Sequence, residues 1–417
     1  MERQIQENLK NAEALEKLYR SDRSGFIAAF NTLYPQISNL EISRFWKARL
    51  QSGHRDEIKI EKKEVLYLVL TCVLVGVLVK IPQLFSLNAE EIFFFQKNAG
   101  LIVFVGIAAY ACLTRGFALN RPVLLTLLFS LGSVIYMNLL PSNDNAQTII
   151  LACLHLPVVL WFLYGLIFMN FESKNLQLRM EYLKHNGELA ILIALIGIAG
   201  GILTGITAGL FSAIDIDIET FYVEYIVIWG LVSVPIVATF IIRHYPQVAS
   251  KIAPIIANIF SPLVLLTLIV YLVSILITGK DPYNDRDFLL VFNLTLLGVM
   301  AIIVFSVSGI SREDQYPYHG LILLALTVIT LVVDLIALSA IIYRLNEYGF
   351  TPNRTVVLGS NLLIFGNLVL IMIDLYKVNF RKATFSKVET TIAKYLPVYL
   401  IWSILVVFLL PLIFKFQ

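Results

Sequence analysis

The chain has 417 residues, of which 58% are hydrophobic and only 15% are charged, and its formal net charge is +3. This composition excludes an ordinary soluble protein, which is about 25% charged, and it excludes intrinsic disorder, which requires the opposite bias. Together with a mean hydropathy of +0.79, it predicts an all-α, polytopic helical membrane protein.

The first 64 residues differ from the rest, because they contain 12 Lys and Arg residues, 10 Asp and Glu residues and no long apolar run. Apolar residues recur there at helical spacing, beginning with Ile5, Leu9 and Leu15, and they predict three short helices. We expect a break at residues 21–25 and the end of the second helix at Pro35. Since helices on a membrane surface are usually basic, the mixed charge favours a small folded domain over interfacial helices.

Eleven apolar stretches follow, and they divide the chain into residues 1–64 and a transmembrane helical bundle over residues 65–417. Each stretch can cross about 30 Å of hydrocarbon as a helix. The predicted spans are 65–87, 99–114, 122–140, 148–169, 189–211, 221–242, 252–278, 289–308, 321–342, 356–376 and 395–416.

The distribution of positive charge between these spans predicts the orientation. Loops after the even-numbered spans carry 13 Lys and Arg residues, whereas the alternate loops carry five. Because positively charged loops stay in the cytoplasm, we expect the N-terminus in the cytoplasm and the C-terminus outside. An odd number of spans agrees with termini on opposite sides.

Glycines at every fourth position mark the fifth predicted span. On a helix, Gly197, Gly201, Gly205 and Gly209 form one stripe without side chains, which another backbone can approach closely. We predict a helix-packing surface. A sliding or gating surface is the functional alternative.

A carboxylate lies in the middle of the ninth span. Asp334 shares one helical face with Thr327, Thr330 and Ala337, and this small, polar face predicts an inward orientation, because a carboxylate facing lipid is costly. The residue is either a proton or cation site or a neutral, hydrogen-bonded structural group.

The tenth span supplies further polar residues at matching depth. Counting 1.5 Å per residue from the outer edge, Asn361 and Asn367 bracket Asp334. We therefore predict a polar path between the ninth and tenth helices, with the members Asp334, Asn361, Asn367, Thr330 and Ser360. Asp374, near Lys377 at the inner end, is predicted to be structural.

The loop between these two helices is the densest polar segment outside the N-terminal region. Gly349 permits a tight turn, and Thr351 with Pro352 begins the next helix. Two interpretations stay open, a capped and ion-paired hairpin or a site at which Arg344, Glu347 and Arg354 take part in binding an anionic group. The predicted outer-loop residues are Arg344, Glu347, Tyr348, Gly349, Thr351 and Arg354.

No motif of known chemistry is present. The chain lacks Gly-x-Ser-x-Gly, His-Glu-x-x-His and P-loop sequences, and its three cysteines form no CxxC pair. Basic runs interleaved with aromatic residues are also missing, which argues against nucleic acid as a partner. We expect no enzymatic activity, no cofactor and no metal.

The segment Tyr348-Gly349-Phe350-Thr351-Pro352-Asn353-Arg354, followed by an apolar helix with Asn361 and Asn367, resembles an uncharacterised bacterial family of polytopic membrane proteins. This is the family known as domain of unknown function 4153, whose members have a similar Tyr-Gly-x-Thr-x-x-Arg segment late in the chain. The resemblance covers about residues 65–417. It implies the bacterial inner membrane as the location, and it implies no activity or substrate.

Two functions compete. The polar residues at matched depth favour a permease or channel-like protein that moves a small solute or ion between the ninth and tenth helices. The alternative is a membrane sensor or scaffold, in which residues 1–64 dock a cytoplasmic protein partner. In both cases the bilayer is the main partner, and a membrane enzyme ranks last.

Overall fold

The computed structural model describes residues 1–9, 11–53, 60–116, 120–143, 145–212, 216–278, 283, 286–309 and 318–416. These residues are 86% helical and contain no strand, so the chain is an all-α, multi-pass membrane protein. It consists of two compact units, Met1–Lys62 and Lys63–Gln417, which are described separately. Some charges in the orientation argument, among them Lys280 and Arg312, lie outside the described residues.

The N-terminal unit is a bundle of four short helices. Two of them have side-chain caps, because Asn11 accepts a hydrogen bond from the backbone N–H of Ala14 at 3.1 Å and Asp22 accepts one from that of Gly25 at 2.9 Å. The helices are α1 (Glu2–Glu7), α2 (Ala12–Ser21), α3 (Arg23–Ile37) and α4 (Glu41–Gly53).

This unit has an apolar core of its own. Phe26 and Trp46 are buried, with ring centroids 4.9 Å apart. The prediction that Pro35 ends the second helix is wrong, because α3 continues to Ile37. Pro35 lies in the last turn, where it removes a single backbone bond, and the burial of Ile37 in the core offsets that loss.

The second unit contains eleven helical segments that overlap the eleven predicted spans. Among the residues that the structure describes, nine helices are long and apolar enough to cross a membrane, and an apolar stretch at Ile259–Ile275 belongs to a tenth. The elements are α5 (Lys62–Val79), α6 (Ile81–Leu84), α7 (Phe94–Arg115), α8 (Arg121–Leu139), α9 (Gln147–Phe168), α10 (Leu176–Ser212), α11 (Glu219–Tyr222), η1 (Val223–Val227), α12 (Ile228–His244), α13 (Pro246–Thr278), α14 (Arg286–Gly309), α15 (His319–Tyr348), α16 (Pro352–Phe380), α17 (Phe385–Ile404), η2 (Leu405–Leu409) and α18 (Leu410–Ile413).

Several boundaries differ from the prediction. The first span ends at Val79 rather than at residue 87, because Pro82 cannot continue the helix and instead lies in the single turn α6, which begins at Ile81. In contrast, α10 begins at Leu176, about four turns before the predicted start. Those extra turns carry charged residues such as Glu181 and Lys184, which hydropathy does not assign to a span.

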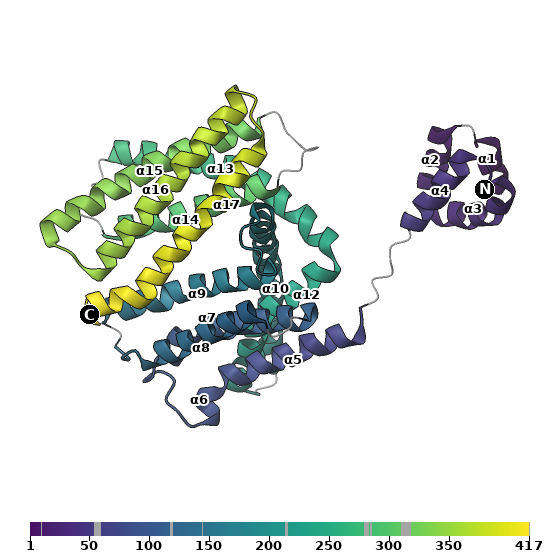
Figure 1. Ribbon diagram of the computed structural model, residues 1–417. Coiled ribbons are helices and arrows are strands. Elements are labelled where there is room, and N and C mark those ends of the chain that lie inside the picture. The colour runs from purple at the N-terminus through teal and green to yellow at the C-terminus, as the bar shows by residue number, and fades with distance from the viewer. Residues whose placement is uncertain are drawn as a thin grey trace. The chain divides into compact units, whose positions relative to one another are not determined.

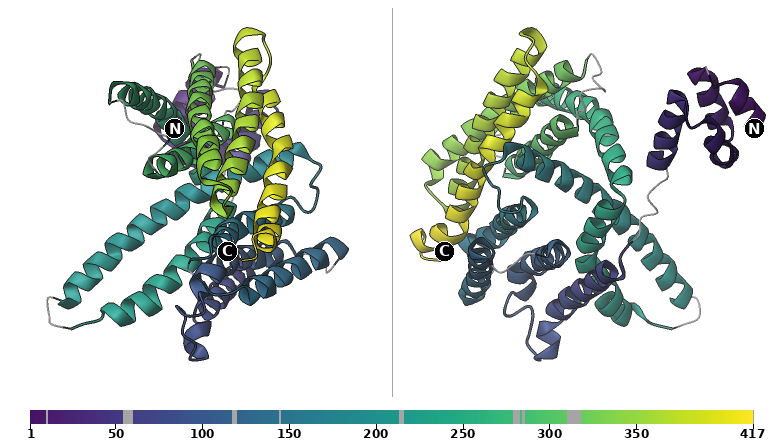
Figure 2. Two further views of the ribbon diagram at one scale, coloured as in Figure 1. Left: turned by 90° about the vertical axis from the view of Figure 1, so that its left-hand side faces the viewer. Right: turned by 45° about the vertical axis from the view of Figure 1, so that its right-hand side comes forward.

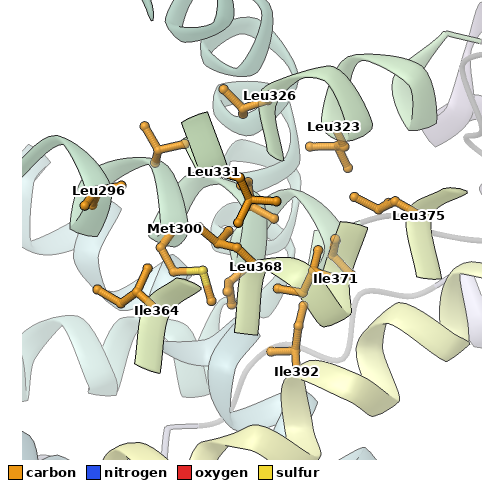
Figure 3. Close-up of a cluster of buried hydrophobic side chains, with 14 of the residues drawn as sticks. Leu296, Met300, Leu323, Leu326, Leu331, Ile364, Leu368, Ile371, Leu375 and Ile392 are labelled. Carbon is orange, nitrogen blue, oxygen red and sulfur yellow. The ribbon is translucent and has the colours of Figure 1, made fainter. Parts of the chain in front are cut away.

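The helices of this unit pack in two groups. Helices α13 to α17 form one group, in which α15 and α16 lie side by side and α17 packs on α16 (Figure 1). Helices α7, α9 and α12 form the other group. The two groups are joined by α10 and by the contact between α9 and α17. The largest apolar cluster belongs to the first group and includes Leu326, Leu331, Leu368 and Ile371 (Figure 3).

The glycine stripe of α10 has a different environment from the one expected. A Cβ added at Gly197, Gly201, Gly205 or Gly209 would meet no atom within 4 Å, whereas one added at Gly359 would lie 2.1 Å from the Trp402 ring. The reason is that the C-terminal part of α10 projects from the rest of the unit beside the α11–α12 segment only (Figure 2, left). No described helix of this chain packs against the stripe, since glycine spacing permits a close approach without causing one.

Candidate functional site

The turn between α15 and α16 is built by local hydrogen bonds. Gly349 ends α15 with a positive φ of 72°, and the Thr351 hydroxyl accepts a hydrogen bond from the backbone N–H of Arg354 at 3.3 Å. Nη1 of Arg354 donates to the carbonyl oxygens of Tyr348 and Gly349, each at 2.9 Å. The predicted loop is therefore a capped hairpin. Glu347 is exposed, and within the described part of the chain it forms no ion pair with an arginine.

The register of this hairpin sets the height of each polar residue. Gly320 on α15 faces the side chain of Asn379 on α16, and at the other end Tyr348 and Pro352 flank the turn. The two helices run antiparallel, so each step of one residue forward along α15 corresponds to one step back along α16. Asp334 is therefore level with residues 365–366, one residue from Asn367. Asn361 lies about 7 Å nearer the turn.

Asp334 is fully buried, with 0% exposure, and neither of its carboxyl oxygens has a hydrogen-bond partner. The hydroxyl groups of Thr327 and Thr330 donate instead to carbonyl oxygens of their own helix, at 2.7 and 2.6 Å. Apolar residues surround this height, because the cluster of Figure 3 includes Leu331 on α15 and Leu368 on α16. In these surroundings the carboxyl group of Asp334 is stable only when it is protonated or when its charged form is paired with a cation.

The other predicted path residues on α16 contact two different helices. Nδ2 of Asn361 donates to Oδ1 of Asn293 on α14 at 2.8 Å. On the α17 side, Nε1 of Trp402 donates to the Ser360 hydroxyl at 2.9 Å. These two polar residues therefore tie α16 to its neighbours and make no contact with Asp334.

Asn367 is the predicted residue that shares the height of Asp334. Its Nδ2 donates to the hydroxyl of Tyr399 on α17 at 2.9 Å, while its Oδ1 is buried without a partner. The structure thus adds Tyr399 to the site, on a helix that the sequence argument did not connect to Asp334.

A cavity of about 400 Å³ lies at the turn end of the hairpin, and we call it the hairpin cavity. It extends inward to Asn293, the partner of Asn361. Helices α9, α14, α15 and α16 line it with Gln147, Asn293, Leu294, Leu297, Ile341, Arg344, Thr351, Asn353, Arg354 and Val357. Three of the predicted outer-loop residues, Arg344, Thr351 and Arg354, therefore share one cavity, whereas Tyr348 and Glu347 point to the surface.

A second polar cluster was missed in the sequence. Helices α7, α9, α10 and α12 surround another cavity of about 400 Å³, where the Tyr164 hydroxyl lies 3.2 Å from Nε2 of His185. Glu188 is buried beside it, and the buried Tyr110 hydroxyl has no hydrogen-bond partner. These residues come from three separate helices, α7, α9 and α10, so no spacing along the chain brings them together. Within the described residues, no group of His, Cys, Asp and Glu is arranged to hold a metal ion.

Comparison with known proteins adds nothing to this geometry: no family model, no curated protein and no solved structure matches the chain.

Proposed function

We propose that this membrane protein is a permease or channel-like protein, which moves a small solute or ion along the α15–α16 hairpin. The observation that carries the proposal is Asp334, a fully buried carboxyl group without a hydrogen-bond partner at the middle of the hairpin. Intramembrane carboxyl groups are expensive, and their usual roles are in ion pathways and proton relays.

The surroundings of Asp334 support a path with three stages. The hairpin cavity comes first, the Asn293–Asn361 pair lies at its inner end, and Asp334 with Asn367, the partner of Tyr399, lies deeper. The apolar cluster around Asp334 closes the path in this conformation. Passage therefore requires α15 to move relative to α16 and α17, as in alternating access.

The charge bias of the loops supports an orientation for this path. With the N-terminal unit in the cytoplasm, the hairpin cavity opens outside, and Asp374 lies toward the cytoplasm. The relationship to the domain of unknown function 4153 family and the location in a bacterial inner membrane belong to the same proposal, on the basis of the Tyr348–Arg354 segment.

The second candidate function is a sensor or scaffold. It is favoured by the separate core of residues 1–62 and by two large apolar side chains on their surface, Leu40 at 44% and Phe45 at 58% exposure. In that case the hairpin cavity would receive a signal molecule and the N-terminal unit would bind a cytoplasmic protein, with no flux across the membrane.

Flux measurements on the reconstituted full chain test the proposal. Proteoliposomes that contain a pH-sensitive dye are exposed to a potassium diffusion potential, and parallel assays use Na⁺ and K⁺ gradients. We expect a proton flux in the wild type, its loss in Asp334→Asn, and no change in the control Glu172→Gln, which alters an exposed loop carboxylate. Flux that is absent from the wild type, or equal in Asp334→Asn, contradicts the proposal.

A further inference from the structure

We infer that the hairpin cavity is a binding site for an oxyanion, the carboxylate or phosphate group of a small ligand. Its role in solute capture rests on the proposed function, but binding itself does not. Three features of the cavity favour such a ligand: its charge, the direction of its amide groups and its size.

The charge of the cavity is positive. Arg344 and Arg354 line it, and none of its described lining residues is acidic. Nε of Arg344 is buried and has no hydrogen-bond partner. Elsewhere in this unit, Arg243 is paired with Glu64 at 3.1 Å, so the fold does provide carboxylates for arginines at other positions.

Two of the three amide side chains that line the cavity offer donors rather than acceptors. Oε1 of Gln147 accepts a hydrogen bond from the backbone N–H of Asn353 at 3.2 Å, and Oδ1 of Asn293 accepts one from Asn361 at 2.8 Å. With both oxygen atoms engaged, the NH₂ groups of Gln147 and Asn293 are the parts left to bind a ligand. Guanidinium and amide N–H groups together fit the oxygens of a carboxylate or phosphate.

The first turn of α16 adds to the same field. Thr351, Asn353 and Arg354 come from the start of this 29-residue helix, whose N-terminal end carries a partial positive charge. Nη1 of Arg354 is fixed by two carbonyl oxygens, which hold the guanidinium in place and leave its other N–H groups for a ligand. A cavity of about 400 Å³ suits a small organic acid or a phosphate compound.

Titration of the purified full-length protein in detergent tests this inference. The probes are inorganic phosphate and succinate, added at constant ionic strength against chloride, and the readout is the dose-dependent rise in Tm. We expect binding to the wild type and a loss of affinity of roughly tenfold or more in Arg344→Gln, which corresponds to about 1.4 kcal/mol or more. Arg344→Lys keeps the charge, so it should lose less.

Matched variants separate this site from general charge effects. Arg381→Gln changes an exposed arginine at the other end of α16 and should bind both probes like the wild type. No rise in Tm for the wild type with any probe, or an equal rise in Arg344→Gln, would overturn the inference. If Arg344→Gln fails to fold, the phosphate affinities of Arg344→Lys and Arg381→Gln are compared instead. A lower affinity in Arg344→Lys supports the inference, and equal affinities overturn it.

Two further arms identify the source of the anion and protect the inference from the fate of the transport proposal. In phosphatidylglycerol nanodiscs, a lipid headgroup that occupies the cavity would compete with phosphate, and Arg344→Gln would remove this competition. If the lipid does not compete with phosphate, the ligand is a free solute. Both results support oxyanion binding. Asp334→Asn should bind phosphate normally, so binding without any wild-type flux refutes transport while the anion site stands.

Discussion

Two buried carboxylates on neighbouring helices have opposite environments. Asp374 on α16 is 7% exposed, accepts a hydrogen bond from the Thr391 hydroxyl at 2.6 Å, and lies 3.3 Å from Nζ of Lys377 and 3.9 Å from that of Lys387. Asp334 on α15 is 0% exposed and has no hydrogen-bond partner. A carboxylate that serves the fold is satisfied, as Asp374 is, so the environment of Asp334 needs a reason other than stability.

The location of each residue along its helix explains the difference. Asp374 is one and a half turns from the end of α16, where the connection to α17 supplies lysines and a threonine. Asp334 lies in the middle of α15, where the neighbouring helices contribute mainly aliphatic side chains. The comparison predicts that changes at Asp374 affect stability and changes at Asp334 affect activity.

Of the changes around the two carboxylates, Asp374→Ala has the largest expected effect on stability. Removing one partner of a buried pair costs about 3–5 kcal/mol, and since both lysines are partly exposed we expect about 2 kcal/mol less free energy of unfolding in detergent. Chemical or thermal denaturation measures it. A change near zero would break the comparison, because Asp374 would then be no better satisfied than Asp334.

A smaller effect distinguishes two threonines. Thr391→Val removes a hydrogen bond to the Asp374 carboxylate and should cost about 1.5 kcal/mol. Thr330→Val removes a hydroxyl that bonds only its own helix, and should cost less than about 0.5 kcal/mol. Equal losses in parallel denaturation curves would show that Thr330 also supports a partner outside its own helix.

The smallest expected effect concerns the glycine stripe. Because nothing lies within 4 Å of the position of an added Cβ, Gly201→Ala should not destabilise the protein, and its better helix propensity should raise the free energy of unfolding by no more than about 1 kcal/mol. Gly359→Ala is the contrasting variant, since its Cβ would collide with Trp402 and cost about 1–3 kcal/mol. A large loss in Gly201→Ala would reveal a partner for the stripe in the membrane, such as a second copy of the chain.

Hydropathy and spacing predicted the features that depend on one helix at a time. All eleven spans are helical, and the small face of Thr327, Thr330 and Ala337 correctly indicated that Asp334 points inward. Features that depend on which helices meet were not predictable in this way. Tyr399, which binds Asn367, and Asn293, which binds Asn361, lie on helices whose position no periodicity reveals.

The same limit explains the glycine stripe and the cluster around His185. A stripe of glycines shows where another helix could approach. Because of the position of α10, no described helix of this chain approaches the stripe. Tyr110, Tyr164 and His185 come from three helices, and each alone looks like a common packing residue. Only the arrangement of the helices brings them to one cavity.

The most direct test of the central claim compares Asp334→Asn with Asp374→Asn in the same flux and denaturation assays. We expect Asp334→Asn to abolish flux while it changes the free energy of unfolding by less than about 0.5 kcal/mol, because the amide keeps the shape of a group that has no partner to lose. Asp374→Asn should lose stability and retain flux at temperatures where it is folded. If instead Asp334→Asn transports like the wild type, or loses its activity only through unfolding, Asp334 is a structural residue and the proposed path is wrong.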